Sequence, residues 1–226
     1  QAVYGPRCRG RRMTMHALRV PVGGRLAQAT LRRRLASTAG HEVFSSGAAL
    51  RLACRRGDFA LPTAGHAPGY VQANLVILPR MHAQDFRAFC AGNAAPCPLL
   101  EMTGPGEFEF RRLAPGSDIR TDLPKYHVWR LGEMVEERTE VVDLWQEDMQ
   151  AFLLGCSFTF EGLLAEAGLV PRHVQEGRNV PMFNTSIPLR GVGLFRGHMV
   201  VSMRPYTPEQ ATRAAAITSD HAYCHG

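Results

Sequence analysis

Residues 74–79 read N-L-V-I-L-P, and this stretch decides the fold class that we expect. Its four apolar residues form an unbroken run, which is typical of a strand that is buried on both faces. Pro79 closes the run because proline has no N–H group to donate to a neighbouring strand. The stretch therefore predicts a strand that lies inside a sheet.

Helical patterns flank this strand. Upstream, Ser46 is a suitable N-cap for a short helix that Gly57 would end. Downstream, residues 82–93 place Phe86 and Phe89 on one helical face and end in Gly-Asn. The buried strand is therefore expected to have a helix on either side of it in the chain.

Two further patterns follow. The segments YHVWR (126–130) and EMVEERTEV (133–141) flank a Leu-Gly pair and predict a β-hairpin. Residues 141–155, VVDLWQEDMQAFLLG, predict the clearest helix of the chain, with Asp143 as its N-cap and Gln146 completing a capping box. The apolar stripe of this helix would consist of Trp145, Met149, Phe152 and Leu153.

The last third of the chain repeats the alternation. Residues 158–169 predict another helix, so residues 154–157 would form a corner between two helices. The segment HMVVSMRP (198–205) predicts a strand, and residues 207–219 predict a final helix with a capping threonine followed by a proline. We therefore expect an α/β or α+β fold with a mixed sheet and flanking helices.

The net charge of +6 is unevenly distributed. Residues 1–40 hold nine of the 26 Lys and Arg residues and no acidic residue, which leaves 17 basic against 20 acidic groups in residues 41–226. This body has no basic cluster, so we do not expect it to bind nucleic acid. The Arg-rich, acid-free stretch is typical of a transit peptide for the mitochondrial matrix. The alternatives are a plastid address, or a basic arm without an address on a cytoplasmic protein.

Several kinds of site are excluded by the sequence. The six cysteines contain no Cys-x-x-Cys pair, so we expect no metal site. Phosphate-binding and dinucleotide-binding glycine motifs, G-x-S-x-G and H-E-x-x-H are absent, and Lys125 is the only lysine. No apolar run is long enough to predict a membrane-spanning helix. An enzyme with this sequence would therefore use acid–base chemistry without a cofactor.

The first candidate site is the corner GCSFTFE at residues 155–161. Free N–H groups at the start of the following helix would favour a carboxylate or a developing oxyanion, and they would lower the pKa of Cys156 if this thiol is exposed. Glu161, about one turn on, could act as a general acid or base. The alternative is a plain structural corner, in which Gly155 is a C-cap, Ser157 is an N-cap and the cysteine is a small buried group.

The second candidate is the polar loop EGRNVPMFNTSIP at residues 176–188. Arg178 could bind a substrate carboxylate through its fork of donors, while Asn179 or Asn184 could bond a carbonyl or an amino group. The alternative is an ordered loop whose side chains satisfy its own backbone. The polar residues of this loop are Glu176, Arg178, Asn179, Asn184, Thr185 and Ser186.

Two smaller candidates lie on predicted strands. Ser202 and Arg204 come at the carboxyl end of the strand near residue 200, where α/β proteins usually build their sites. Asn74, together with Tyr70 and Gln72, could line a cavity at the entry to the buried strand. The alternatives are an arginine in a salt bridge at a strand end, and side chains that only pack a loop.

Six segments of the body carry a resemblance to known proteins. They are PTAGHAPGYVQANLVILP, CPLLE, LAPGSDIRTDLPKYHVWR, FLLGCSFTFE, EGRNVPMFNTSIP and MVVSMRP. These segments resemble the hydro-lyase family of bacterial proteins, over residues 48–218, and the mitochondrial D-glutamate cyclase of animals carries a related N-terminal domain. Members of the family continue further, so the resemblance implies that their C-terminal part is missing here.

The resemblance implies a lyase that eliminates water from a small carboxylate and, for the cyclase relative, closure of D-glutamate to 5-oxo-D-proline. A lactam-forming site should hold two carboxylates, protonate the departing oxygen and stabilise an oxyanion. Arg178 and Arg204 suit the first need. Glu161 or Glu176 suits the second, and the backbone at residues 155–157 suits the third.

The remaining predictions concern partners. Catalytic roles are assigned to Glu161, Glu176, Cys156 and Ser157. Substrate binding is assigned to Arg178, Asn179, Asn184, Thr185, Ser202, Arg204 and Asn74. The partner would be a small carboxylate or amino acid, with an oligomer left open. The competing hypothesis is a module without catalysis, which holds a carboxylate metabolite or a partner protein and is stabilised by its ligand without forming product.

Overall fold

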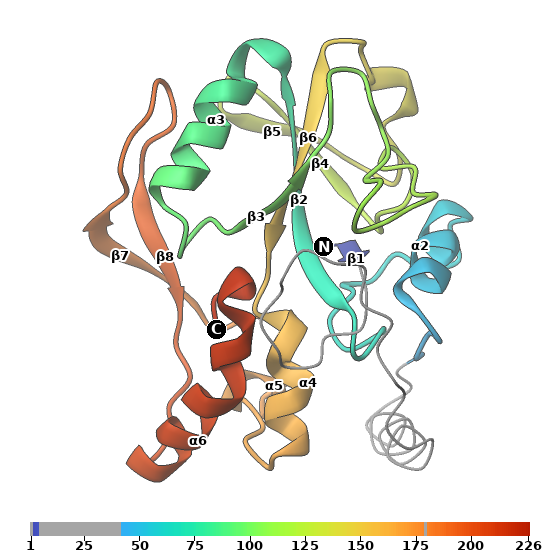
Figure 1. Ribbon diagram of the computed structural model, residues 1–226. Coiled ribbons are helices and arrows are strands. Elements are labelled where there is room, and N and C mark those ends of the chain that lie inside the picture. The colour runs from blue at the N-terminus through green and yellow to red at the C-terminus, as the bar shows by residue number, and fades with distance from the viewer. Residues whose placement is uncertain (1, 5–41, 179) are drawn as a thin grey trace.

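The computed structural model of the chain describes residues 2–4, 42–178 and 180–226. Its centre is a four-stranded sheet in the order β1-β2-β6-β3, in which every pairing is antiparallel (Figure 1). The strands of this sheet are β1 (Ala2–Tyr4), β2 (Val71–Pro79), β3 (Leu99–Met102) and β6 (Met149–Gly155). The predicted class of helices with strands is confirmed, and the antiparallel pairing places it in α+β.

Helices and two-stranded ribbons surround this sheet (Figure 1). The ribbons pair β4 (Tyr126–Arg130) with β5 (Glu133–Arg138), and β7 (Met182–Pro188) with β8 (His198–Ser202). The helices are α2 (Gly47–Arg55), α3 (Arg80–Gly92), α4 (Phe158–Glu166), α5 (Arg172–Gln175) and α6 (Pro208–Thr218). Two 3-10 helices, η1 (Val142–Leu144) and η2 (Ser219–Cys224), complete the described elements.

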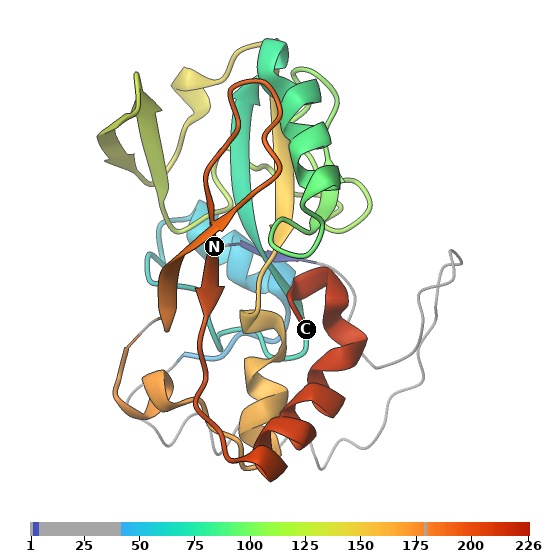
Figure 2. The ribbon, with the colours of Figure 1, turned by 90° about the vertical axis from the view of Figure 1, so that its left-hand side faces the viewer.

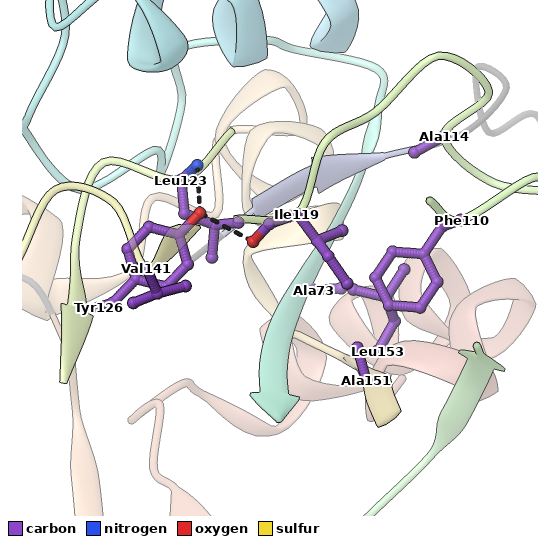
Figure 3. Close-up of a cluster of buried hydrophobic side chains, with 9 residues drawn as sticks. All are labelled: Ala73, Phe110, Ala114, Ile119, Leu123, Tyr126, Val141, Ala151 and Leu153. Atoms are coloured by element: carbon purple, nitrogen blue, oxygen red, sulfur yellow. Dashed lines mark hydrogen bonds between the residues drawn. The ribbon is translucent and has the colours of Figure 1, made fainter. Parts of the chain in front are cut away.

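The predicted buried strand is confirmed as β2, and it is covered on both faces. Ala73 lies in a cluster on one face, with Leu75 and Ile77 packed against it, and Figure 3 shows how Phe110 and Ile119 approach it from a loop. Val76 and Leu78 pack on the other face against the apolar side of α3. An apolar run without alternation is the expected result when both faces of a strand are buried.

The helix predicted over residues 141–155 is wrong. Residues 142–144 form η1, and residues 149–155 form β6, which pairs with both β2 and β3. Ala151 and Leu153 face one core while Phe152 faces the other, so the middle of the strand is apolar on both faces. Such a strand contains apolar residues at helical spacing too, which is why its pattern resembled an amphipathic helix.

The other predicted elements are confirmed where the structure describes them. Ser46 Oγ accepts a hydrogen bond from the Ala49 N–H at 3.1 Å and caps α2, and residues 126–138 form the β4–β5 hairpin. Thr207 and Gln210 form a reciprocal capping box at the start of α6. The predicted transit peptide lies outside the described residues, apart from the three residues of β1.

The β7–β8 ribbon departs from the expected loop, since residues 182–188 form a strand rather than an irregular connection. Figure 2 shows the ribbon standing in front of the central sheet. Its connecting loop is held to α3, because Asn93 bonds both the backbone N–H and the carbonyl of Arg190. The strand β7 itself is mostly exposed on both faces.

No helix within the described ranges is long and apolar enough to cross a membrane. The helices α4 and α6 instead pack on each other below the sheet, through Phe160, Leu164, Leu169 and Ala214 (Figure 1). The 3-10 helix η2 then leads the chain back to the end of β6, where Gly155 lies against the backbone of Tyr223. The end of the central strand is therefore enclosed by α4, α6 and η2.

Candidate functional site

The corner after β6 joins the central strand to α4. Gly155 ends the strand, and the Cys156 N–H still donates to the Gln72 carbonyl of β2 at 3.1 Å. Gly155 is therefore not the predicted C-cap of a helix. It is required because a Cβ atom at this position would clash with the Tyr223 carbonyl oxygen. The corner places the start of α4 at the end of the most deeply buried strand.

The predicted oxyanion site in the backbone of this corner is not formed. The Thr159 N–H donates to the Cys156 carbonyl at 3.0 Å, and the Phe160 N–H donates to the Ser157 carbonyl at 3.2 Å. The Phe158 N–H bonds the Cys156 thiol. Because these donors are used locally, the helix start does not present them to a ligand.

The condition set for the activation of Cys156, an exposed thiol, is not met, since the thiol is buried. Burial raises its pKa, and the negative charge of Glu161 adds to the effect, while the Phe158 N–H and Arg204 oppose it. A raised pKa keeps the thiol protonated at neutral pH. The structure therefore supports Cys156 as a packing residue and not as a nucleophile.

Three of the predicted site residues do come together at this corner. Arg204, in the segment between β8 and α6, donates from Nη2 to Glu161 Oε1 at 2.6 Å and to Ser157 Oγ at 3.1 Å. The Arg204 and Glu161 side chains are only 14% and 12% exposed. The guanidinium carbon also lies 5.6 Å from the centre of the Phe160 ring. Residues 43 positions apart in the sequence therefore form one mostly buried ion pair.

A fourth residue, His173, joins this cluster, and the sequence analysis missed it. Its Nε2 lies 3.6 Å from Glu161 Oε1, and its side chain is 5% exposed. The residue belongs to α5, a single turn between Pro171 and Glu176. The available signal was a histidine directly before the polar loop, since histidine is the side chain that ordinarily titrates near neutral pH. We refer to Ser157, Glu161, His173 and Arg204 as the Glu161 cluster.

Two members of the cluster carry polar atoms without partners. Within the described residues, both ring nitrogens of His173 and Nε of Arg204 are enclosed and make no hydrogen bond. Buried polar groups are nearly always bonded, so such atoms need an explanation, such as a ligand or a catalytic role. Burying an ion pair also costs desolvation energy, so this pair is weak evidence for a purely stabilising role.

The side chains of the other predicted residues make no hydrogen bond or ion pair with this cluster within the described residues, although the Arg178 backbone N–H donates to the His173 carbonyl at 2.8 Å. Glu176 is exposed and pairs with Arg172 at 2.8 Å and with Arg178 at 3.8 Å, and the Arg178 side chain is 76% exposed. Thr185 Oγ1 donates to the Met199 carbonyl within the β7–β8 ribbon, so it serves the ribbon backbone. Asn74, Asn184 and Ser202 are exposed on strands, and Asn179 lies outside the described residues. Within the described residues, the hydrogen bonds and ion pairs of the Glu161 side chain involve Arg204 and His173 and no residue of 176–188. The structure therefore joins the corner at residues 155–161 to Arg204 and leaves the side chains of the polar loop out.

The described residues contain no group of three or more His, Cys, Asp or Glu side chains that could hold a metal ion. The Glu161 cluster offers one carboxylate, one imidazole, one hydroxyl and one guanidinium. These groups can neutralise negative charge and move protons. The fold and the cluster together define an α+β domain with a mostly buried cluster of polar and charged side chains at the end of its central strand.

Comparisons with known proteins place this domain in a family. Residues 150–226, which include the whole Glu161 cluster, match the family model described as D-glutamate cyclase. Three proteins named "Putative hydro-lyase" are about half identical to the chain. The relative from Geobacillus kaustophilus is 52% identical over 172 residues, which are 76% of this chain and 65% of the relative. The relative from Rubrobacter xylanophilus is 54% identical over 172 residues, which are 76% of this chain and 66% of the relative.

The third relative, from a Methylobacterium species, is 51% identical over 187 residues, which are 83% of this chain and 67% of the relative. The chain belongs to the hydro-lyase family. It spans about two thirds of the length of the curated relatives that it matches.

Proposed function

We propose that the chain acts as a hydro-lyase that eliminates water from a small carboxylate, with D-glutamate, closed to 5-oxo-D-proline, as the first substrate to test. Membership of the hydro-lyase family and the match to the D-glutamate cyclase model support this proposal. The structural observation that carries it is the mostly buried Glu161–Arg204 pair, which leaves the enclosed Nε of Arg204 without a partner.

Each member of the pair has a role in such a reaction. Arg204 supplies a fixed positive charge, and its Nε can donate to a substrate carboxylate or to the oxygen that departs. Glu161 Oε1 accepts the hydrogen bond from Arg204, while Oε2 accepts no hydrogen bond from the described residues. Ser157 holds Arg204 in place through its hydroxyl oxygen.

The test compares residues to which the sequence analysis assigned the same role, but of which the structure places only one in the Glu161 cluster. The chain is incubated with D-glutamate, and 5-oxoproline is measured by chiral chromatography. Glu161→Gln should lower turnover about 100-fold or more because it removes the carboxylate of the Glu161 cluster, while Glu176→Gln should leave turnover unchanged. Arg204→Ala and Arg178→Ala form the second matched pair, with the loss expected only for Arg204→Ala.

Two results would contradict the proposal. Full turnover by Glu161→Gln would exclude the Glu161 cluster as the site. Thermal stabilisation by amino or hydroxy acids without any product would favour the competing hypothesis of a binding module.

A further inference from the structure

His173 differs from the other buried histidines of the described residues. His66 and His221 are equally buried, yet Nδ1 of His66 bonds the Glu42 carbonyl at 2.6 Å and Nδ1 of His221 bonds the Tyr223 hydroxyl at 3.1 Å. Both ring nitrogens of His173 are enclosed without a hydrogen bond to any described residue. A histidine that only filled the core would be expected to satisfy at least one nitrogen, as the other two do.

The ring is also aimed at the acid of the cluster. His173 Nε2 lies 3.6 Å from Glu161 Oε1, the oxygen that already accepts from Arg204. This distance is too long for a hydrogen bond, and a small shift of the ring would close it. Catalytic hydrogen bonds are often long before substrate binds and tighten in the complex.

The proposed reaction requires a group that both takes and gives protons. In the closure of D-glutamate, the amino nitrogen forms a bond to the C5 carbon and the bond from C5 to one carboxylate oxygen breaks. The ammonium group loses two protons, and the departing oxygen gains two protons and leaves as water. Because the two counts are equal, a site can carry these protons from nitrogen to oxygen with no net gain or loss.

We infer that His173 is the residue that carries these protons, and that Glu161, held by Arg204, orients its ring. This inference rests on the proposed function and deepens it. An imidazole can accept a proton at one nitrogen and donate from the other, which a guanidinium cannot do because it is always protonated. Arg204 holds Glu161 in place through the 2.6 Å hydrogen bond to Oε1, which suits a carboxylate that orients a histidine.

The kinetic test uses the full chain and a matched pair of buried histidines. His173→Gln should lower kcat about 100-fold or more with KM changed by less than about threefold, because the substrate still binds but its protons are not transferred. The limb of the pH–rate profile that reports this histidine should disappear. His66→Gln is the control, since it removes an equally buried ring that lies near α2, and it should leave kcat and the profile unchanged. Retention of wild-type kcat by His173→Gln would overturn the inference.

A second measurement does not depend on turnover or on the folding of a variant. The chain is labelled with 15N-histidine, and the ring nitrogens are followed by NMR while 5-oxo-D-proline is added as the probe. A change of the His173 ring signals, with those of His66 unchanged, would support a ring that contacts the ligand. In a second sample labelled with 15N-arginine, a shift of the Arg204 Nε signal without any change of the His173 signals would show that the inference is wrong while the proposed function stands. If the wild-type chain turns over no carboxylate, the proposed function fails, and an unchanged His173 signal then overturns the inference independently.

Discussion

The carboxylates of Asp122 and Glu161 are both held by arginines, and they differ in how many of their hydrogen bonds are made. Asp122, in the loop before β4, is 1% exposed and accepts from Arg55 Nε at 2.6 Å, from Arg55 Nη2 at 2.9 Å and from the Asp118 N–H at 3.0 Å. Arg51 Nε lies 3.7 Å from the same carboxylate. Within the described residues, Glu161 accepts one hydrogen bond, from Arg204, and lies beside His173, whose ring nitrogens make no hydrogen bond.

The difference separates a structural link from a site. Both oxygens of Asp122 accept hydrogen bonds. These bonds tie α2 to a loop because Arg55 and Asp122 are 67 positions apart in the sequence, so this network stabilises the fold. The Glu161 cluster leaves donors and acceptors unused inside the protein, which costs stability unless a ligand completes them. Substitutions in the two regions should therefore affect different properties.

The largest expected effect on stability is that of Asp122→Ala. This change leaves Arg51 and Arg55 without their carboxylate, and breaking a buried ion pair typically costs about 3–5 kcal/mol of unfolding free energy. Urea unfolding followed by circular dichroism measures the loss. Turnover per folded molecule should stay at the wild-type level, and a selective loss of activity would remove the distinction between the two regions.

Glu161→Gln should produce the opposite pattern. The amide oxygen can still accept from Arg204, so the unfolding free energy should fall by only about 1–2 kcal/mol. Turnover should fall about 100-fold, which corresponds to about 2.7 kcal/mol of transition-state stabilisation. A stability loss as large as that of Asp122→Ala, with normal activity in the folded fraction, would show that the Glu161 cluster is structural.

Gly155→Ala tests the packing of η2 against the end of β6. The added methyl group would clash with the Tyr223 carbonyl oxygen, so η2 must move away from β6. Overpacking of this kind usually costs about 1–3 kcal/mol. Thermal unfolding measures the change, with Gly162→Ala on α4 as the control because a Cβ atom there meets nothing within 4 Å. Equal stability of the two variants would contradict the tight packing of η2.

The smallest expected effect is a difference between the two regions in the pH at which the free energy of unfolding declines. Burial lowers the pKa of His221, which packs near Phe160 in α4, although the charge of Asp220 opposes the shift. In this pH range the unfolded chain binds more protons than the folded chain. The free energy of unfolding therefore falls as the pH decreases from 6.5, the ordinary pKa of histidine, toward the lower pKa of His221 in the folded chain. The slope is at most about 1.4 kcal/mol per pH unit. The variant His221→Phe should flatten this decline in urea titrations between about pH 7 and about pH 5, which bracket the ordinary pKa of histidine.

The region of Asp122 should respond at lower pH. Burial would raise the pKa of Asp118, but its hydrogen bonds and ion pair with Arg120 outweigh burial and lower it. The stability that this pair contributes is present above the ordinary value of 3.8 and is lost only as the pH falls through the lower folded value. A variant Asp118→Asn should therefore leave unchanged the loss of unfolding free energy that His221 causes near pH ~6.5, the ordinary pKa of histidine.

Much of the fold could be predicted because its signals are local. The cap at Ser46, the cap at Thr207 and the turn at Leu131-Gly132 depend on residues within a few positions of each other, and all three are confirmed. The strand β6 was mistaken for a helix because its apolar residues contact two cores at once, and no local pattern records that. The strand β7 was missed because its Pro-rich polar sequence is typical of a loop.

The sequence by itself determined the family, the starts and ends of most elements, and a set of polar residues that included Ser157, Glu161 and Arg204. Only the tertiary structure decided which of these residues meet, since Arg204 reaches Glu161 across 43 positions while Arg178 points to solvent. It also placed His173 beside Glu161, with both ring nitrogens buried and without a hydrogen bond to any described residue. The physical reason is that burial and pairing are properties of the packed chain, because they depend on segments that are distant in sequence.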